Sequence, residues 1–272
     1  MAPAAAGLQP AGRHHGRFGG SGDLRSAIQD QVVGNPPKPK REPLTVKIKY
    51  AVGVTVCIAA VCSEGEKELI VLCSDRRISY GVGIGGAEIG FKLGLAGPGW
   101  AAMIAGTMSN AQRLLSFYRN HLNSVALTES NVRTEMDVPL IRYRDWLANR
   151  SRIAPDLVKF DEQLILSGYV EEMPFLFMVS CEGVDEHRHF AVIGTGSWLA
   201  QAALLQREYT SATDVEEALY LVYEAKKFSE KDDYVGKRTM ILVQESPLNP
   251  TNPAVTVRTV SLDGLRHLVL LG

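Results

Sequence analysis

The sequence predicts an α+β fold, a four-layer αββα sandwich in which two antiparallel sheets lie between helical layers. The first observation is the order of the expected elements: four strands, two helices, three strands, two helices and closing strands. A doubly wound parallel sheet would instead alternate each strand with a helix. The second observation is composition, because 272 residues with 46% hydrophobic and 22% charged residues suffice for an apolar core.

The first four strands come before any helix. Two apolar β-type runs flank a charged turn at 63–68, which predicts a hairpin. A glycine-rich loop at 81–90 then leads to a second pair of runs around a Gly-Pro-Gly turn at 97–99. The expected strands are 52–62, 69–79, 91–96 and 100–105.

Apolar residues at helical spacing follow in 109–122 and 129–149. Leu115, Tyr118 and Trp146 extend the apolar positions of these helices beyond one face, so we expect them to offer surface for subunit contacts. The same kinds of pattern continue to the end of the domain. Further strands are expected at 163–169, 174–180, 190–193, 239–244 and 255–260, and further helices at 197–208 and, after the N-cap Asp214, at 215–228.

The residues before this domain have a different character. Residues 1–49 are rich in Ala and Gly and then carry four prolines among basic residues, so little in them can bury an apolar face. We expect a disordered extension at 1–49 and one domain at 50–272. No secretory signal pattern opens the chain, which makes the cytoplasm the expected location.

Composition and motif searches exclude several classes of function. The net charge of −1 gives no basic field for nucleic acid, and the longest apolar run, 50–62, is too short to span a bilayer. The four cysteines form no zinc-type spacing, and HExxH, GxxxxGK[ST] and GxSxG motifs are absent, so no metal or cofactor is expected. Residues 81–86 match GxGxxG, but a strand follows instead of a helix, which favours a plain loop.

Polar residues inside apolar strands are the informative anomaly. Strand alternation places Asp75, Arg77 and Ser79 on one face, and Lys92 interrupts another apolar run. Ionised groups in a strand core are costly unless paired, so a structural ion pair between Asp75 and Lys92 is one interpretation. Thr55 heads the first strand, and the hairpin brings it beside the Asp75 strand, which favours chemistry as the second interpretation.

At these residues the chain resembles the β-type subunits of proteasomes and the related bacterial peptidase subunits, which belong to the N-terminal nucleophile (Ntn) hydrolases. The resemblance runs from about residue 53 to 245. It is carried by TVCIAAVC at 55–62, IVLCSDRR at 70–77, FKL at 91–93, MIAGTMSNAQ at 103–112, GTGS at 194–197 and DDYVG at 232–236.

The resemblance implies a role for each matching residue. Thr55 stands at the position of the catalytic threonine, Lys92 at that of the catalytic lysine, and Gly106 at that of the glycine whose N–H helps to form the oxyanion hole. The other implied positions are Asp75 in the catalytic set, Arg77 and Ser79 at the substrate-binding part of the second-strand motif, and Thr195 and Asp232 as supports of the amine. The chain departs from the family at Val54, where glycine is usual, and at Val235, where serine is usual.

The chemistry of a threonine nucleophile requires a free α-amine. A threonine hydroxyl needs a base, and an α-amino group with a pKa of about 7.7–8.0 suits that role at neutral pH. Thr55 is internal, so the chain as written should be inactive. Two routes to a free Thr55 stay open. Autolysis could cut after Val54 and remove a propeptide, or translation could begin at Val54, which would make the preceding residues an artefact of the gene model.

The expected function is therefore that of a threonine-type peptidase or amide hydrolase acting on peptides or proteins. The resemblance also implies a homo-oligomeric ring and an ATPase unfoldase as a partner. Two alternatives stay open at this point: a non-catalytic structural subunit of such a ring, and a small-molecule amidase that uses the same site.

Overall fold

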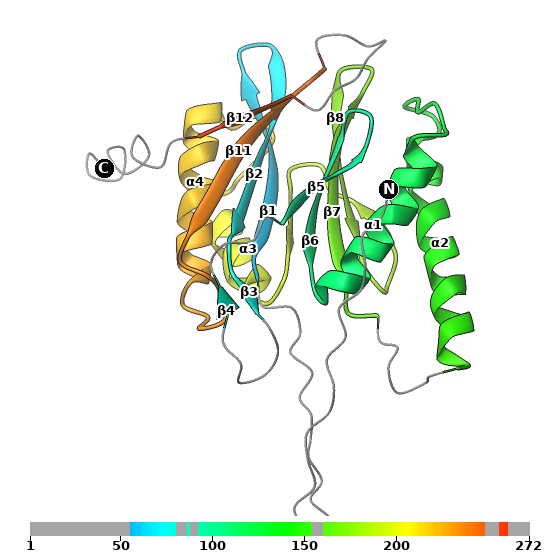
Figure 1. Ribbon diagram of the computed structural model, residues 1–272. Coiled ribbons are helices and arrows are strands. Elements are labelled where there is room, and N and C mark those ends of the chain that lie inside the picture. Colours follow the sequence, from blue (N-terminus) through cyan, green and yellow to red (C-terminus); the bar gives the residue numbers. More distant parts are fainter. Residues whose placement is uncertain (1–54, 80–85, 88–91, 154–159, 248–255, 261–272) are drawn as a thin grey trace, which may run out of the picture. The chain divides into compact units, whose positions relative to one another are not determined.

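The structure, a computed structural model, describes residues 55–79, 86–87, 92–153, 160–247 and 256–260 (Figure 1). All of these residues belong to one unit of the chain, Ile48–Gly272. The expected extension at 1–49, the first residues of the strand expected at 52–62, and most of the loop expected at 81–90 lie outside the described residues.

The first of the two large sheets contains the hairpin predicted from the two apolar runs. Its five strands are antiparallel to their neighbours. In spatial order they are β10 (Phe190–Ile193), β1 (Cys57–Glu64), β2 (Lys67–Asp75), β11 (Thr239–Glu245) and β12 (Thr256–Thr259).

The second large sheet follows the chain order and is antiparallel throughout. Its strands are β5 (Leu93–Gly97), β6 (Trp100–Ala105), β7 (Gln163–Val170), β8 (Met173–Val179) and β9 (Val184–Glu186). β9 was not predicted, because a three-residue Val-Asp-Glu strand carries almost no alternation of apolar and polar residues.

Helices cover the outer face of each sheet, which gives the four layers (Figure 1). α1 (Met108–Leu122) and α2 (Val132–Ser151) pack on the second sheet, and α3 (Ser197–Gln206) and α4 (Val215–Ser229) pack on the first. Three apolar clusters fill the space between successive layers. The predicted αββα sandwich is confirmed.

Details of the helices confirm one local prediction and contradict another. Asp214 is the N-cap of α4, and its carboxylate accepts a hydrogen bond from the Glu216 N–H at 2.9 Å. Leu115 and Tyr118, expected to offer subunit contact surface, are instead buried in the core. Trp146 is partly buried and stacks on Tyr143. The apolar residues beyond one face of each helix are buried because α1 and α2 pack on each other as well as on the sheet.

The second strand ends earlier than its sequence predicts. The structure ends β2 at Asp75, and the following residues form a separate two-residue strand, β3 (Ile78–Ser79), paired with β4 (Gly86–Ala87). The cause is the Asp75 carboxylate, whose Oδ2 accepts the Arg77 N–H at 3.1 Å and turns the chain away from the sheet. Strand alternation therefore does not continue from Asp75 to Arg77 and Ser79.

The turn of the first hairpin is tighter than the predicted 63–68. Glu64 pairs with Lys67, which leaves two residues in the turn. Gly65 takes a φ of +66°, the left-handed backbone that such turns require and that glycine adopts at little cost.

A buried polar cluster links the two sheets. Gln244 of β11 is fully buried between them, and its Oε1 accepts a hydrogen bond from Ser167 Oγ at 2.7 Å. The Gln244 Nε2 donates to the carbonyl oxygen of Gly99 at 3.3 Å, and the backbone carbonyl oxygen of Gln244 accepts from the Tyr169 hydroxyl at 2.9 Å. We call these residues the cross-sheet cluster. It fixes how the second sheet lies against the first.

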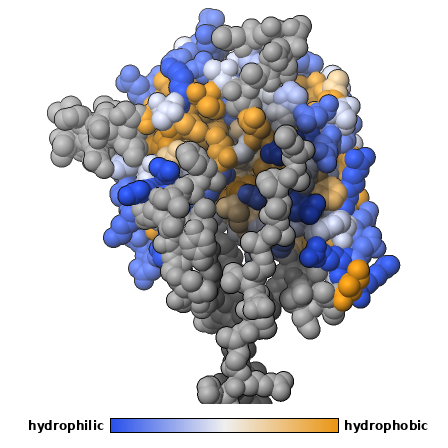
Figure 2. Space-filling view, in the orientation of Figure 1, coloured by the Kyte–Doolittle hydropathy of each residue, from blue (hydrophilic) through white to orange (hydrophobic). Residues whose placement is uncertain are grey.

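Several large hydrophobic side chains remain exposed within the described residues. On the face shown in Figure 2, hydrophobic residues gather in the region where β11 and β12 lie in Figure 1. The most exposed include Ile153, Trp198, Tyr234, Leu205, Leu95 and Ile141. Among the helices of the described part of the chain, none is long and apolar enough to cross a bilayer.

Candidate active site

Thr55, Asp75 and Lys92 meet at one end of the sandwich. The Thr55 hydroxyl donates to Asp75 Oδ1 at 2.6 Å, and Lys92 Nζ donates to the same oxygen at 2.6 Å. Lys92 Nζ also donates to Thr55 Oγ1. A hydroxyl, a carboxylate and an ammonium group thus form a closed triangle of hydrogen bonds.

The fold explains why these three residues converge. Thr55 comes two residues before β1, and Asp75 is the last residue of the antiparallel strand β2. The Asp75 N–H donates to the carbonyl oxygen of Val56 at 3.2 Å, which holds the two chain segments side by side. Lys92 precedes β5 in the other sheet, and its carbonyl oxygen accepts the Ile104 N–H at 3.0 Å. The site therefore takes its hydroxyl and carboxylate from one sheet and its ammonium group from the other.

Burial makes the charges of this triangle mutually dependent. Asp75 is 0% exposed, Lys92 3% and Thr55 2%. A buried charge is tolerated only when it is paired and hydrogen-bonded. Asp75 meets both conditions, because its two oxygens accept from five donors: Thr55 Oγ1, Lys92 Nζ and the N–H groups of Val56, Arg77 and Gly236.

A buried thiol lies beside the triangle but is not activated as a nucleophile. Burial raises the pKa of Cys57 to about 12, and its Sγ donates a weak hydrogen bond to the Ile104 carbonyl oxygen at 3.7 Å. At neutral pH the thiol stays protonated, and a protonated thiol attacks poorly.

The backbone of Thr55 is held by the turn after β10. Its nitrogen donates to Thr195 Oγ1 at 3.3 Å, and its carbonyl oxygen accepts from Thr195 Oγ1 at 3.3 Å and from the Gly196 N–H at 3.2 Å. Gly194 has a φ of +96°, and a Cβ there would lie 2.3 Å from the Thr55 carbonyl oxygen. This part of the Gly-Thr-Gly-Ser motif is thus shaped to let Thr55 approach closely.

Gly106, expected at the oxyanion hole, follows β6 at the same end of the sandwich. Its φ is +96°, and a Cβ would lie 2.6 Å from the Asp161 carbonyl oxygen, so only glycine fits. Next to it lies Glu162, which is 1% exposed and whose two carboxylate oxygens have no hydrogen-bond partner in the described part of the chain. Burial raises the pKa of Glu162 to about 7.

The other predicted site residues lie farther out. The Asp232 carboxylate accepts the Tyr234 N–H at 2.9 Å, and among the described residues it is not a hydrogen-bond partner of Thr55. The Arg77 guanidinium donates to the Asp233 carbonyl oxygen at 2.8 Å, which ties it to the same loop. Ser79 lies in β3, and its side chain is outside the described part of the structure.

Two residues that support the site were missed by sequence reasoning. The Gly236 N–H donates to Asp75 Oδ2 at 3.1 Å. The family-like segment 232–236 includes Gly236, but the resemblance assigned a role only to Asp232. Gln163, at the start of β7, accepts the Gly194 N–H at 3.0 Å and so connects the second sheet to the turn that holds Thr55. No sequence pattern distinguishes Gln163 from any other polar residue at the start of a strand.

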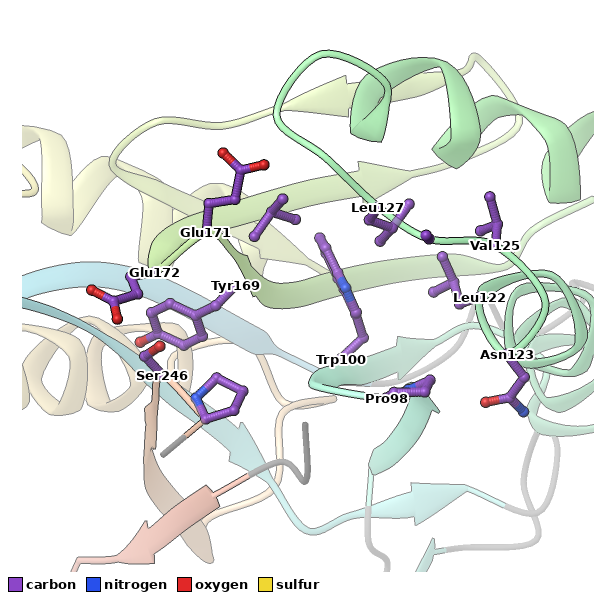
Figure 3. A pocket seen from close by; sticks show the side chains of 13 residues that line it. Pro98, Trp100, Leu122, Asn123, Val125, Leu127, Tyr169, Glu171, Glu172 and Ser246 are labelled. Atoms are coloured by element: carbon purple, nitrogen blue, oxygen red, sulfur yellow. The ribbon is translucent and has the colours of Figure 1, made fainter. Parts of the chain in front are cut away.

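A pocket lined by described residues lies at the opposite end of the sandwich (Figure 3). It has a volume of about 680 Å³ and is open to solvent. Figure 3 shows Trp100 in its interior and Tyr169 near the two glutamates of the β7–β8 turn, Glu171 and Glu172. Trp100 begins β6 and Tyr169 is near the end of β7, whereas the site triangle lies where β6 ends and β7 begins.

Comparisons with solved structures agree with the fold. In solved structures, the fold is similar to an Anbu mutant from Hyphomicrobium sp. strain MC1, with a TM-score of 0.58 and 21% identity over 79% of this chain and 91% of that one. It is also similar to the Anbu complex of Pseudomonas aeruginosa, described as a helical assembly, with a TM-score of 0.59 and 18% identity over 79% of this chain and 93% of that one.

The sequence comparisons identify the family. The chain is 28% identical over 166 residues to proteasome subunit beta 2 of Nitrosopumilus maritimus (strain SCM1). This alignment covers 59% of this chain and 73% of the relative. The model of the proteasome subunit family matches residues 55–243, a span that begins at Thr55 and includes both large sheets except β12 and the last two residues of β11. The chain therefore belongs to the proteasome subunit family.

Proposed function

We propose that this chain is a threonine-type peptidase whose nucleophile is the hydroxyl of Thr55 once that residue has become the N-terminus. The observation that carries the proposal is the triangle of Thr55, Asp75 and Lys92, two buried opposite charges that converge on a single hydroxyl. A purely structural ion pair needs no hydroxyl at its centre. Membership of the proteasome subunit family supports amide hydrolysis as the reaction.

Each group has a defined role in this reaction. The free α-amine of Thr55 takes the proton from Oγ1 as that oxygen forms a bond to the substrate carbonyl carbon. The carbonyl electron pair moves onto its oxygen, and the N–H of Gly106 stabilises the resulting oxyanion. Breaking the C–N bond releases the leaving amine, which takes the proton back from the Thr55 ammonium group. Water then adds to the ester with the same amine as base, and breaking the ester bond restores Thr55.

Lys92 and Asp75 make this sequence of steps feasible. The Lys92 ammonium group contacts Oγ1 and stabilises the alkoxide character that develops there. As a nearby positive charge it also favours the neutral form of the Thr55 amine, which is the form that acts as a base. Asp75 holds Lys92 charged and oriented at 2.6 Å.

The proposal requires that residues before Thr55 are removed. In the full chain the nitrogen of Thr55 is an amide and cannot act as a base. N-terminal sequencing and intact-mass measurement of the purified protein should therefore find a chain that begins at Thr55. An active protein that retains residues 1–54 would contradict the mechanism.

Activity is tested on the form that begins at Thr55. We expect it to hydrolyse fluorogenic peptides, and Thr55→Ala to abolish turnover because no hydroxyl remains. Thr55→Ser supplies a matched control, since it keeps both the hydroxyl and the amine. Equal rates for Thr55→Ala and the wild type would contradict the proposal and favour a non-catalytic subunit.

We also propose that the chain acts as a homo-oligomer. Exposed apolar side chains such as Trp198, Leu205 and Ile141 supply contact surface on α2 and α3. An assembly is named for the Anbu complex, a structural relative. Native mass spectrometry should show a multimer, and Trp198→Glu should reduce its size. A monomer that hydrolyses small amides but not peptides would favour a small-molecule amidase.

A further inference from the structure

A fully buried lysine that the proposed reaction does not use lies behind the site. Lys226, in the last turn of α4, is 0% exposed, whereas the next residue, Lys227, has a side chain that is 44% exposed. Lys226 Nζ donates to the carbonyl oxygens of Gly236 at 2.8 Å and Lys237 at 3.1 Å, and to Glu230 Oε1.

These contacts satisfy every donor of the ammonium group. An ammonium group has three N–H donors and no acceptor, and here each donor has its own oxygen. Burial lowers the pKa of Lys226, while the hydrogen bond and charge of Glu230 act in the opposite direction. An apolar residue of similar length would fill the same space without the free-energy cost of desolvating a charge. The ammonium group therefore serves the contacts that it makes and not only the packing of α4.

The segment that Lys226 holds is the one that contacts the site. Gly236 offers its carbonyl oxygen to Lys226 and its N–H to Asp75 Oδ2 at 3.1 Å. A Cβ at Gly236 would lie 2.8 Å from that carboxylate oxygen and 2.6 Å from the Cβ of Arg77, so the segment is pressed against Asp75. The other oxygen of Asp75 binds Thr55 Oγ1 and Lys92 Nζ.

We propose that Lys226 is a positioning residue of the active site. It holds the backbone at Gly236 in place, so that the Gly236 N–H keeps the Asp75 carboxylate in the orientation that Thr55 and Lys92 require. The proposal rests on the proposed function for its kinetic consequence. The structural consequence is independent of activity, since it concerns only the segment 231–238 and the groups hydrogen-bonded to Asp75.

The test compares Lys226→Met with Lys227→Met in the form that begins at Thr55. Methionine keeps much of the apolar stem and removes all donors. In Lys226→Met the Glu230 carboxylate retains a partner, because Lys227 Nζ donates to its other oxygen at 2.6 Å. Lys227→Met removes a lysine one position along the same helix and leaves the contacts of Lys226 to the segment in place.

We expect Lys226→Met to lower kcat by about 10- to 100-fold with KM changed less than about threefold, the effect typical of losing a residue that orients a catalytic group. Hydrogen–deuterium exchange should become faster in segment 231–238 and at the Val56 amide, which donates to Asp75 Oδ1. Lys227→Met should change neither kcat nor exchange. If Lys226→Met does not fold, the double variant Lys226→Met, Glu230→Gln removes both charges and is measured in its place.

The outcomes separate the two proposals. Wild-type kcat in a folded variant without Lys226, or unchanged exchange at 231–238 and Val56, overturns the positioning role. A large rise in KM alongside the loss in kcat also overturns it, even if exchange is faster, because that result indicates general loosening of the substrate site. If the wild-type chain hydrolyses nothing, the proposed function fails, and the exchange measurement still decides whether Lys226 orients Asp75.

Discussion

The two ends of the sandwich differ in how they treat polar groups. At one end, Asp75 and Lys92 are buried and directly paired, and the Asp75 carboxylate accepts hydrogen bonds from five donors. At the other end, a pocket of about 680 Å³ is lined by Trp100 and Tyr169, and its glutamates are exposed to solvent. The two ends therefore differ in kind, because one buries opposite charges around a hydroxyl whereas the other exposes its charges beside an open pocket.

Among variants that remove a charge, the largest effect is expected at the buried end from Lys92→Met, which keeps much of the apolar stem. In the form that begins at Thr55, peptide hydrolysis should fall by on the order of 10³-fold, because the alkoxide loses its stabilising cation. Lys67→Met, on the exposed part of β2, is the matched control and should keep the wild-type rate. A folded Lys92→Met variant with wild-type turnover would show that the pair with Asp75 is only structural.

A second effect concerns stability at the same end. Asp75→Asn leaves the Lys92 ammonium group buried without a counter-charge, and we expect a loss of about 3–5 kcal/mol in the free energy of unfolding. Urea denaturation measures it. Asp185→Asn, at an exposed position of β9, should change the free energy by less than about 0.5 kcal/mol. Equal effects of the two variants would mean that the triangle contributes nothing to stability.

A smaller, pH-dependent effect is expected from Glu162, whose pKa burial raises to about 7. Between the ordinary value of 4.5 and about 7, the unfolded state is ionised while the folded state keeps its proton, so this residue lowers stability as pH rises. Glu162→Gln should therefore be more stable than the wild type by about 2–3 kcal/mol at pH 8, and nearly equal to it at pH 5.

Unfolding in urea at the two pH values tests this prediction. The exposed Glu182→Gln is the control and should show no such dependence on pH. A stability difference between Glu162→Gln and the wild type that is the same at both pH values would contradict it.

The smallest effect is expected at the pocket end. Glu171→Gln and Glu172→Gln should leave kcat/KM for short peptides within about twofold of the wild type, since both carboxylates are exposed and lie far from Thr55 along β7. A tenfold or larger loss for either variant would break the contrast between the two ends and make the pocket part of the peptidase site.

The core of the site was predictable because its residues violate the pattern around them. Asp75 and Lys92 are ionic residues in apolar runs, and Thr55 heads such a run, so each was visible without a structure. The order of strand and helix blocks likewise predicted the layers. What the sequence could not reveal is the end of β2, because it depends on where the side chain of Asp75 finds its donors.

Lys226 shows a second limit of sequence reasoning. Lys226 and Lys227 are adjacent identical residues, yet one is buried and the other is exposed. Helical spacing offered a clue, since Lys226 follows the buried Val222 by four positions and so shares its face. The acceptors that make the burial tolerable, the carbonyl oxygens of Gly236 and Lys237, come from the chain after the helix, and no periodicity predicts them.

The cross-sheet cluster around Gln244 has a consequence for how Thr55 and Lys92 stay aligned. Apolar contact between two sheet faces has no preferred direction, so it specifies their lateral position less sharply than hydrogen bonds do. Gln244 accepts a hydrogen bond from Ser167 Oγ and donates one to the Gly99 carbonyl oxygen, and these directional bonds resist lateral displacement of one layer against the other. Thr55 and Lys92 belong to opposite layers, so a lateral slip of about 1 Å at the far end would separate them enough to impair reaction geometry.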